Sequence, residues 1–204
     1  MGHTYSNITL RNIHHSEAVA ALSDRPAFVS KTREECAVVF DRASERTSIV
    51  GVSALAARLS SDLRCIALAA LNHDDSILQL RLYRNGALLD QYDSAPGYFS
   101  PQALPSPPSG GDATLFAEAF EATDVAGIER ILRSYTPFDF TRLGEPNAKQ
   151  SKYALAVDRH RDLAAILDLP RFVAGLAFSA IAHGNVENYG VKQSEFFNTE
   201  AGEP

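Results

Sequence analysis

The stretch ILQLRLYRNGALLDQY, residues 77–92, decides the type of fold that this chain can adopt. Leucines alternate with more polar residues over its first half, which is the pattern of a strand with one buried face. Asn85-Gly86 then interrupts the alternation, and this pair favours a type I′ turn, whose two central residues need positive φ. Residues 77–83 and 87–92 are therefore predicted to form a β-hairpin.

The residues before this hairpin show the order β-α-β-β-α-β. The predicted strands cover residues 5–10, 27–30, 36–40 and 65–71, and the predicted helices cover residues 16–22 and 53–63. Ser16 and Ser53 are the predicted N-caps of the two helices. This order matches the ferredoxin-like pattern. We therefore expect an α+β fold whose ferredoxin-like β-α-β-β-α-β core is extended by the β-hairpin into a mainly antiparallel sheet.

That topology makes a prediction about the two cysteines, Cys36 and Cys65. Their strands would flank the first strand and lie about 10 Å apart. A disulfide needs Cα atoms closer than about 7 Å, so both thiols are predicted to be free. Two cysteines are also too few for the disulfide framework of a secreted protein.

Residues 100–111 mark a change of composition, because four prolines and two glycines fall within them. Such a run is predicted to be an extended connector rather than a helix or a central strand. The chain is predicted to comprise an α+β sheet domain over residues 1–99, a Pro/Gly-rich linker over 100–111, a helical segment over 112–184 and a polar tail over 185–204.

The helical segment is predicted to begin with two helices capped by Asp112 and Asp124. Residues 138–150 are predicted to be irregular, and Ser151 is expected to begin a longer helix that ends at Leu167. Residues 172–182 are predicted to form a last helix that is apolar nearly all round and therefore buried. Two arrangements remain open: the helices cover the second face of the sheet, or they form a separate unit beside a face used for dimerisation.

Composition excludes several classes of partner. The formal net charge is −6, and a nucleic-acid binder usually carries a basic excess instead. The N-terminal residues lack the pattern of a signal peptide, and the longest near-apolar stretch, residues 172–182, is shorter than the roughly 20 residues of a membrane span. We expect a cytoplasmic protein that binds neither nucleic acid nor membrane.

Asn72-His73-Asp74-Asp75 and Tyr98 are the candidate binding residues. The four-residue run follows a buried strand, and a histidine beside carboxylates could bind a divalent metal or exchange protons. Asn, Asp and Ser are also typical turn residues, and the next strand starts close by, which favours a turn. A metal site usually needs three protein ligands, and nothing nearby completes the set. Tyr98 either lines a pocket or anchors the linker, and we predict no catalytic residue, metal or cofactor.

Three other features receive structural interpretations. Gly110-Gly111-Asp112 could form a phosphate-binding turn at a helix N-terminus, but it lacks a lysine, and an acidic N-cap repels phosphate. Helix capping is therefore favoured. His160 is predicted to be a partly buried packing residue, and the cysteines lie among apolar neighbours without an adjacent histidine.

Several of these stretches resemble an uncharacterised family of small soluble bacterial proteins. The resemblance rests on Leu71 to Asp75, Leu82-Tyr83, Gly86, Asp90, Tyr92, Pro96-Gly97-Tyr98-Phe99 and Gly110-Gly111-Asp112. It covers most of the chain and implies a bacterial cytosolic protein, but it implies no activity.

Three functional hypotheses follow. The first is a non-enzymatic interaction module, such as an acidic regulator or an immunity-type protein, whose charge favours a partner with a basic surface. The second is an enzyme with a pocket at the end of the sheet formed by residues 72–75. The third is a small-molecule sensor that dimerises edge to edge.

Overall fold

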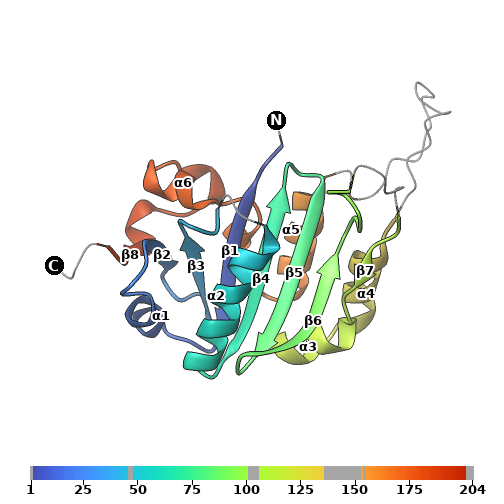
Figure 1. Cartoon of the computed structure of the whole chain (residues 1–204), viewed down its shortest axis with the longest axis horizontal. Coiled ribbons are helices and arrows are strands. Elements are labelled where there is room, and N and C mark those ends of the chain that lie inside the picture. Colours follow the sequence, from blue (N-terminus) through green and yellow to red (C-terminus); the bar gives the residue numbers. More distant parts are fainter. Residues whose placement is uncertain (1, 46–47, 101–105, 136–152, 154, 201–204) are drawn as a thin grey trace.

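The computed structural model describes residues 2–45, 48–100, 106–135, 153 and 155–200, which build an α+β fold (Figure 1). In chain order the strands are β1 (Tyr5–Arg11), β2 (Ala27–Ser30), β3 (Cys36–Asp41), β4 (Ile66–His73), β5 (Ile77–Arg84), β6 (Ala87–Asp93), β7 (Ser109–Gly110) and β8 (Phe196–Asn198). They form one eight-stranded sheet in the order β7-β6-β5-β4-β1-β3-β2-β8. All of its neighbouring strands are antiparallel.

The predicted hairpin at residues 77–92 is confirmed as β5 and β6. Asn85 and Gly86 have φ angles of 51° and 82°, as a type I′ turn requires. Leu78, Leu80 and Leu82 all point to one face, where they are fully buried.

Helices α1 (His15–Ala21) and α2 (Ile49–Asp62) cover one face of the sheet (Figure 1). Ile8 and Leu10 of β1 pack against them in a fully buried cluster. Because side chains alternate along a strand, the odd-numbered residues of β1 point to the opposite face. The two faces of the sheet are therefore packed by different parts of the chain.

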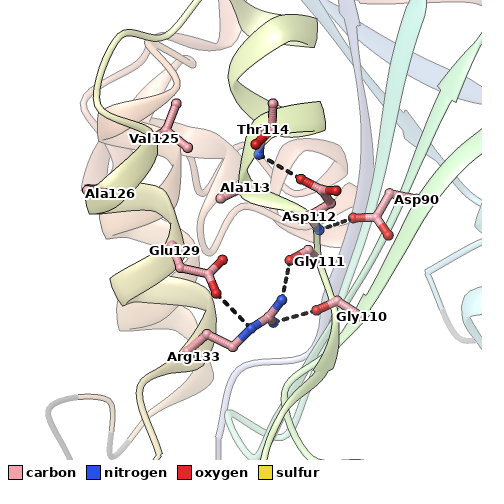
Figure 2. A pocket seen from close by; sticks show the side chains of 10 residues that line it. All are labelled: Asp90, Gly110, Gly111, Asp112, Ala113, Thr114, Val125, Ala126, Glu129 and Arg133. Carbon is pink, nitrogen blue, oxygen red and sulfur yellow. Dashed lines mark hydrogen bonds and ion pairs between the residues drawn. The ribbon is translucent and has the colours of Figure 1, made fainter.

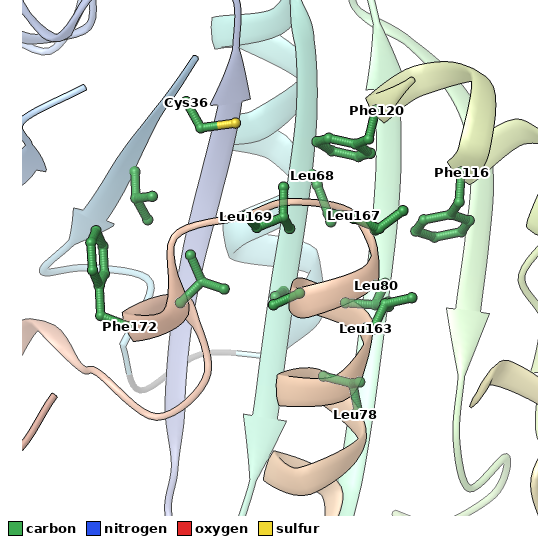
Figure 3. Packing of buried hydrophobic residues seen from close by; sticks show 14 of the residues in the cluster. Cys36, Leu68, Leu78, Leu80, Phe116, Phe120, Leu163, Leu167, Leu169 and Phe172 are labelled. Carbon is green, nitrogen blue, oxygen red and sulfur yellow. The ribbon is translucent and has the colours of Figure 1, made fainter. Parts of the chain in front are cut away.

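The second face is covered by residues that follow β7. They form α3 (Ala113–Phe120), α4 (Val125–Arg133), α5 (Ala156–Ile166), the 3₁₀ turn η2 (Arg171–Val173) and α6 (Phe178–Ala182). Figure 3 shows Leu163 of α5 and Leu167, which caps the end of α5, among the sheet residues Leu68 and Leu80, all in one cluster. The helical segment thus packs on the sheet and buries its second face.

A polar stripe lies beneath these helices. Tyr5, Asn7, Thr9 and Arg11 of β1 are at most 7% exposed, although β1 is a central strand. Asn7 Nδ2 donates to the carbonyl of Val173, and the Oδ1 atom of Asn7 is buried without a partner. Most buried polar atoms in proteins are hydrogen-bonded, so this stripe is an unusual feature of the core.

Two predicted helix starts are wrong. The second helix begins at Ile49 rather than after Ser53, which lies inside α2. In the first helix, His14 rather than Ser16 is the N-cap, and it forms a capping box with Glu17. Ser48 is the N-cap of α2, although its side chain makes no cap hydrogen bond among the described residues, and Ser53 is a second serine with the same sequence signal.

The predicted caps Asp112 and Asp124 are confirmed as the N-caps of α3 and α4. The end of the linker adds β7 to the edge of the sheet, where a proline-rich segment can pair. Helix α5 begins at Ala156 and not at the predicted Ser151, which lies outside the described residues, as does the segment predicted to be irregular.

The prediction of one continuous last helix over residues 172–182 is wrong. The chain forms η2, then adopts a φ of 118° at Gly175, and only then begins α6. This backbone conformation is open to glycine and interrupts an α-helix. The apolar residues are nevertheless buried, because both short pieces pack on the sheet.

The prediction of a loose polar tail is also wrong for its described part, residues 185–200. Strand β8 pairs with β2, and Phe196 packs its ring against Phe40 and Phe172. Val186 and Val191 are buried as well. A few apolar residues therefore hold a segment whose composition is mostly polar.

The cysteine prediction is confirmed: both thiols are free and buried. Cys36 lies in the core beneath the C-terminal helices, whereas Cys65 packs with α1 and α2 on the other side. No helix among the described residues is long and apolar enough to cross a membrane.

Candidate functional site

The predicted binding run ends β4 in a tight turn. Asp74 and Asp75 have φ angles of 50° and 52°, and Ser76 N donates to the carbonyl of His73 at 3.0 Å. Aspartate tolerates this left-handed conformation better than most residues do. The turn interpretation of these residues agrees with this geometry.

Asn72 and Asp75 are buried and face inward to hold the N-terminus. Asn72 Nδ2 donates to Asp75 Oδ1 at 3.0 Å and to the carbonyl of His3 at 2.8 Å. The His3 amide and ring Nδ1 both lie 2.8 Å from Asp75 Oδ2. Burial works to raise the pKa of Asp75, but the hydrogen bonds from His3 and Asn72 outweigh it and lower that pKa below its usual value. These two residues fasten β1 to the turn.

His73 and Tyr98 belong to a separate, exposed group. With Phe99 they form three mutually tilted rings, whose centroids are 5.1 to 6.1 Å apart. Tyr98 is 43% and Phe99 60% exposed. Of the five predicted binding residues, the structure brings His73 and Tyr98 together, buries Asn72 and Asp75, and leaves Asp74 in the exposed turn, where its Oδ1 accepts from Gly2 N.

An acidic pocket of about 760 Å³ lies between β6, the start of α3 and the outer side of α4 (Figure 2). We call it the acidic pocket; it is lined by Asp90, Gly110, Gly111, Asp112, Ala113, Thr114, Val125, Ala126, Glu129 and Arg133. Three of these residues are acids and one is basic. The remaining residues are small or apolar, so carboxylates dominate its polar chemistry.

Arg133, the one cation among the described residues that line the pocket, is engaged by the protein itself. Arg133 donates through its two terminal nitrogens to the carbonyls of Gly110 and Gly111, and its Nε lies 3.1 Å from Glu129 Oε1 (Figure 2). Asp90 Oδ2 accepts from the Asp112 amide at 2.5 Å. The wall is therefore held rigidly while the net formal charge of the lining stays negative.

Glycine is required where β7 meets this pocket. Gly110 has a φ of 66°, and a Cβ built there would lie 1.9 Å from the carbonyl oxygen of Gln91. No side chain fits such a close approach. Gly110 thus lets the chain pass β6 closely before α3 begins.

The sequence revealed only part of this pocket. Gly110-Gly111-Asp112 was identifiable as a turn, and its capping role is confirmed because Asp112 Oδ1 accepts from the amides of Thr114 and Leu115. Asp90 and Glu129 carry no local motif, and only the packing of α4 beside β6 brings them to the same place. The one signal in the sequence was an acidic residue, Asp90, on the face of a strand that the helices cover.

Replacing Asp112 by alanine is expected to lower the free energy of unfolding by about 1 kcal/mol, because α3 loses its N-cap. Asparagine is an equally good cap, so Asp112→Asn should leave stability nearly unchanged while removing the charge. Urea denaturation followed by circular dichroism measures both. Equal losses in the two variants would contradict a capping role.

A second cavity, of about 610 Å³, lies beside Phe28 of β2 and α6. Its lining carries the cation Arg42, the carboxylates Glu45 and Glu200 and the imidazole of His183, so charges of both signs line it. Glu45 Oε1 also accepts from the amide of Ser179 at the start of α6. This cavity therefore indicates no ligand class.

The buried titratable groups are held in unreactive forms. Burial raises the pKa of Cys36 to about 12 and that of Cys65 to about 11, so neither thiol is a thiolate at neutral pH. Burial lowers the pKa of His160 to about 4, and its Nδ1 lies 2.8 Å from the hydroxyl of Tyr5. Among the described residues, no group of three or more His, Cys, Asp or Glu side chains could hold a metal ion.

Comparison of the chain with protein-family models, curated proteins and solved structures found no match.

Proposed function

We propose that this protein is a non-enzymatic interaction module that binds a basic segment of a partner protein in the acidic pocket. One observation carries the proposal: carboxylates from β6, from the cap of α3 and from α4 converge on a pocket in which the one cation among the described lining residues is already engaged. A lysine or arginine side chain would supply the missing positive charge.

The electrostatics of the whole chain support this assignment. The formal net charge is −6, which steers a basic partner toward the protein before contact. Gly111 and Ala126 contribute little bulk to the lining, and Val125, 38% exposed, offers an apolar surface. The aliphatic part of a lysine or arginine would pack there while its charged end met the carboxylates.

The sheet end at residues 72–75 supports an enzyme or sensor less well. Asn72 Nδ2 donates to the carbonyl of His3, and Asp75 Oδ2 accepts from the amide of His3, so these atoms already have partners within the protein. His73 and Tyr98 present aromatic rings there, without a shared pocket among the cavities described above.

The proposal includes a ferredoxin-like core and a cytoplasmic location. The strand order β4-β1-β3-β2, with α1 and α2 on one face, supports a ferredoxin-like arrangement of the first six elements. Free, buried thiols suit a reducing compartment. The acidic net charge, the pocket lined by carboxylates and the free thiols together support an acidic regulator or immunity-type protein.

A direct test uses a basic probe peptide, acetyl-(Lys-Val)₄-amide, and isothermal titration calorimetry at low salt. The double variant Asp112→Asn/Glu129→Gln should bind the peptide about tenfold more weakly, because two carboxylates of the pocket lose their charge. Binding should also weaken as salt is added.

The matched control is Glu34→Gln/Glu187→Gln, which removes the same net charge at exposed sites away from the pocket. It should bind nearly as the wild type does. Equal weakening in the two double variants would show that only overall charge matters and would overturn the assignment of the pocket, as would an absence of binding by the wild type.

A further inference from the structure

The outer edge of β6 is only partly covered. Strand β7 pairs with Tyr92 and Asp93, and Gly111 N donates to the carbonyl of Gln91 at 2.8 Å. The chain then turns away into α3, and within the described residues no strand pairs with Ala87–Leu89 on this side. An open strand edge presents unpaired N–H and C=O groups and is a template for another strand.

The open edge adjoins the acidic pocket. Asp90, the next residue of β6, lines that pocket, and Asp112 at the start of α3 contacts it. Leu88, which is 50% exposed, lies on the open stretch itself. A strand placed beside Ala87–Leu89 would continue the line of β7 and pass the mouth of the pocket.

We propose that the basic segment binds as an added β-strand along Ala87–Leu89 and directs a lysine or arginine side chain into the acidic pocket. This inference rests on the proposed function and specifies how the segment is held. Main-chain hydrogen bonds to β6 would supply affinity, and alternate side chains would supply specificity. Opposite charges on neighbouring strands, here a basic residue beside Asp90, stabilise such pairing.

The pattern of the bound segment follows from the geometry of β6. Side chains of a strand alternate between faces, so every second residue would point toward the pocket. Strand β6 carries a bulge at Leu89, the extra residue between the pairs Leu82–Asp90 and Tyr83–Leu88, and this bulge places Leu88 and Asp90 on different faces. A bound segment in which basic and apolar residues alternate could therefore place a basic residue toward Asp90 and an apolar residue toward Leu88.

Charge argues against a second copy of this chain as the occupant. Pairing of β6 with β6 of another molecule would bring Asp90, Asp112 and Glu129 of both copies toward one another. Each copy also carries a formal net charge of −6. Like charges placed opposite each other across strands are destabilising, whereas a basic strand is attracted.

The test compares three forms of acetyl-(Lys-Val)₄-amide by calorimetry with the full chain. The first is unmodified, the second is N-methylated on its valines and the third on its lysines. Alternate amides of a strand point to opposite sides, so only one of the methylated peptides should lose the bonds to β6. We expect that peptide to bind at least about tenfold more weakly than the other methylated peptide.

Amide resonances of Ala87, Leu88 and Leu89 in isotope-labelled protein should shift on binding of the unmodified peptide and gain protection from hydrogen exchange. Equal affinity of the two methylated peptides would overturn strand addition while leaving binding in the pocket intact. Loss of all binding, including that of the unmodified peptide, would instead overturn the proposed function. A dimer paired through β6 without peptide, detected by sedimentation, would assign the edge to a second copy and also overturn the inference.

Discussion

Replacing Arg159 by methionine is expected to lower the free energy of unfolding by about 2–4 kcal/mol, because the carbonyls that end α4 lose a buried donor. Arg159 is 5% exposed. Its Nη1 donates to the carbonyls of Ile131 and Leu132 at 2.5 and 3.2 Å, and its Nη2 donates to that of Ser134 at 2.6 Å. These carbonyls end a helix, where the last turn leaves acceptors unpaired.

The cation also complements the negative end of the helix dipole of α4. Its guanidinium lies 4.8 Å from the centre of the Tyr153 ring, which adds a cation–π contact. Methionine would fill much of the space but would remove the Arg159 donor from the carbonyls of Ile131 and Ser134, while that of Leu132 still accepts from the hydroxyl of Tyr92 at 3.0 Å. The cost of buried acceptors without partners is the main term in the expected loss.

Arg161 provides a matched control on the same helix. Its side chain is 59% exposed and pairs with Asp158 of α5 at the surface, at 2.6 Å. Arg161→Met should therefore cost no more than about 0.5 kcal/mol. Urea denaturation at pH 7 measures both variants, and similar losses would contradict a special role for Arg159 in holding α4.

Acidification from pH 7 to pH 4 is expected to remove about 3 kcal/mol of stability through His160 alone. Burial lowers the pKa of His160 to about 4, whereas an unfolded chain binds the proton near pH 6.5. Between these two values the unfolded state carries the extra proton. The free energy of unfolding must then fall as the pH drops through this window.

The variant His160→Asn isolates this contribution, since the side-chain amide of asparagine takes the place of Nδ1 beside the hydroxyl of Tyr5 but does not titrate. Urea midpoints measured from pH 7 to pH 4 should decline less steeply in the variant than in the wild type. Asp75, whose pKa is lowered, loses its stabilising contribution only below its usual unfolded value near 3.9, so it adds little in this window. Parallel declines in the two proteins would contradict the expectation.

The positions of β1 to β6 along the chain were largely predictable. Alternating leucines and Asn85-Gly86 specify a hairpin within a few residues of sequence, because the turn and the side-chain alternation are local properties. The helices and strands that precede this hairpin likewise depend on short-range patterns in the sequence. Helix ends were less predictable. Helix α2 starts at Ile49, earlier than predicted, because a helix start without a side-chain cap depends on its packing.

Segments held by distant partners were predicted poorly. The tail forms β8 because β2, far away in sequence, offers an edge, and because Phe196 fits against Phe40. The break at Gly175 likewise reflects how two short apolar pieces fit the sheet rather than the helix propensity of either. Tertiary contacts override local preference wherever that preference is weak.

By itself, the sequence determined an acidic chain with an antiparallel sheet, two free cysteines and capped helices at Asp112 and Asp124, since composition, alternation and capping are properties of neighbouring residues. Only the tertiary structure decided that Asp90, Asp112 and Glu129 share one pocket and that a polar stripe runs beneath the helices. The physical reason is that packing α4 beside β6 joins residues from separate segments, and no local pattern encodes which of them meet.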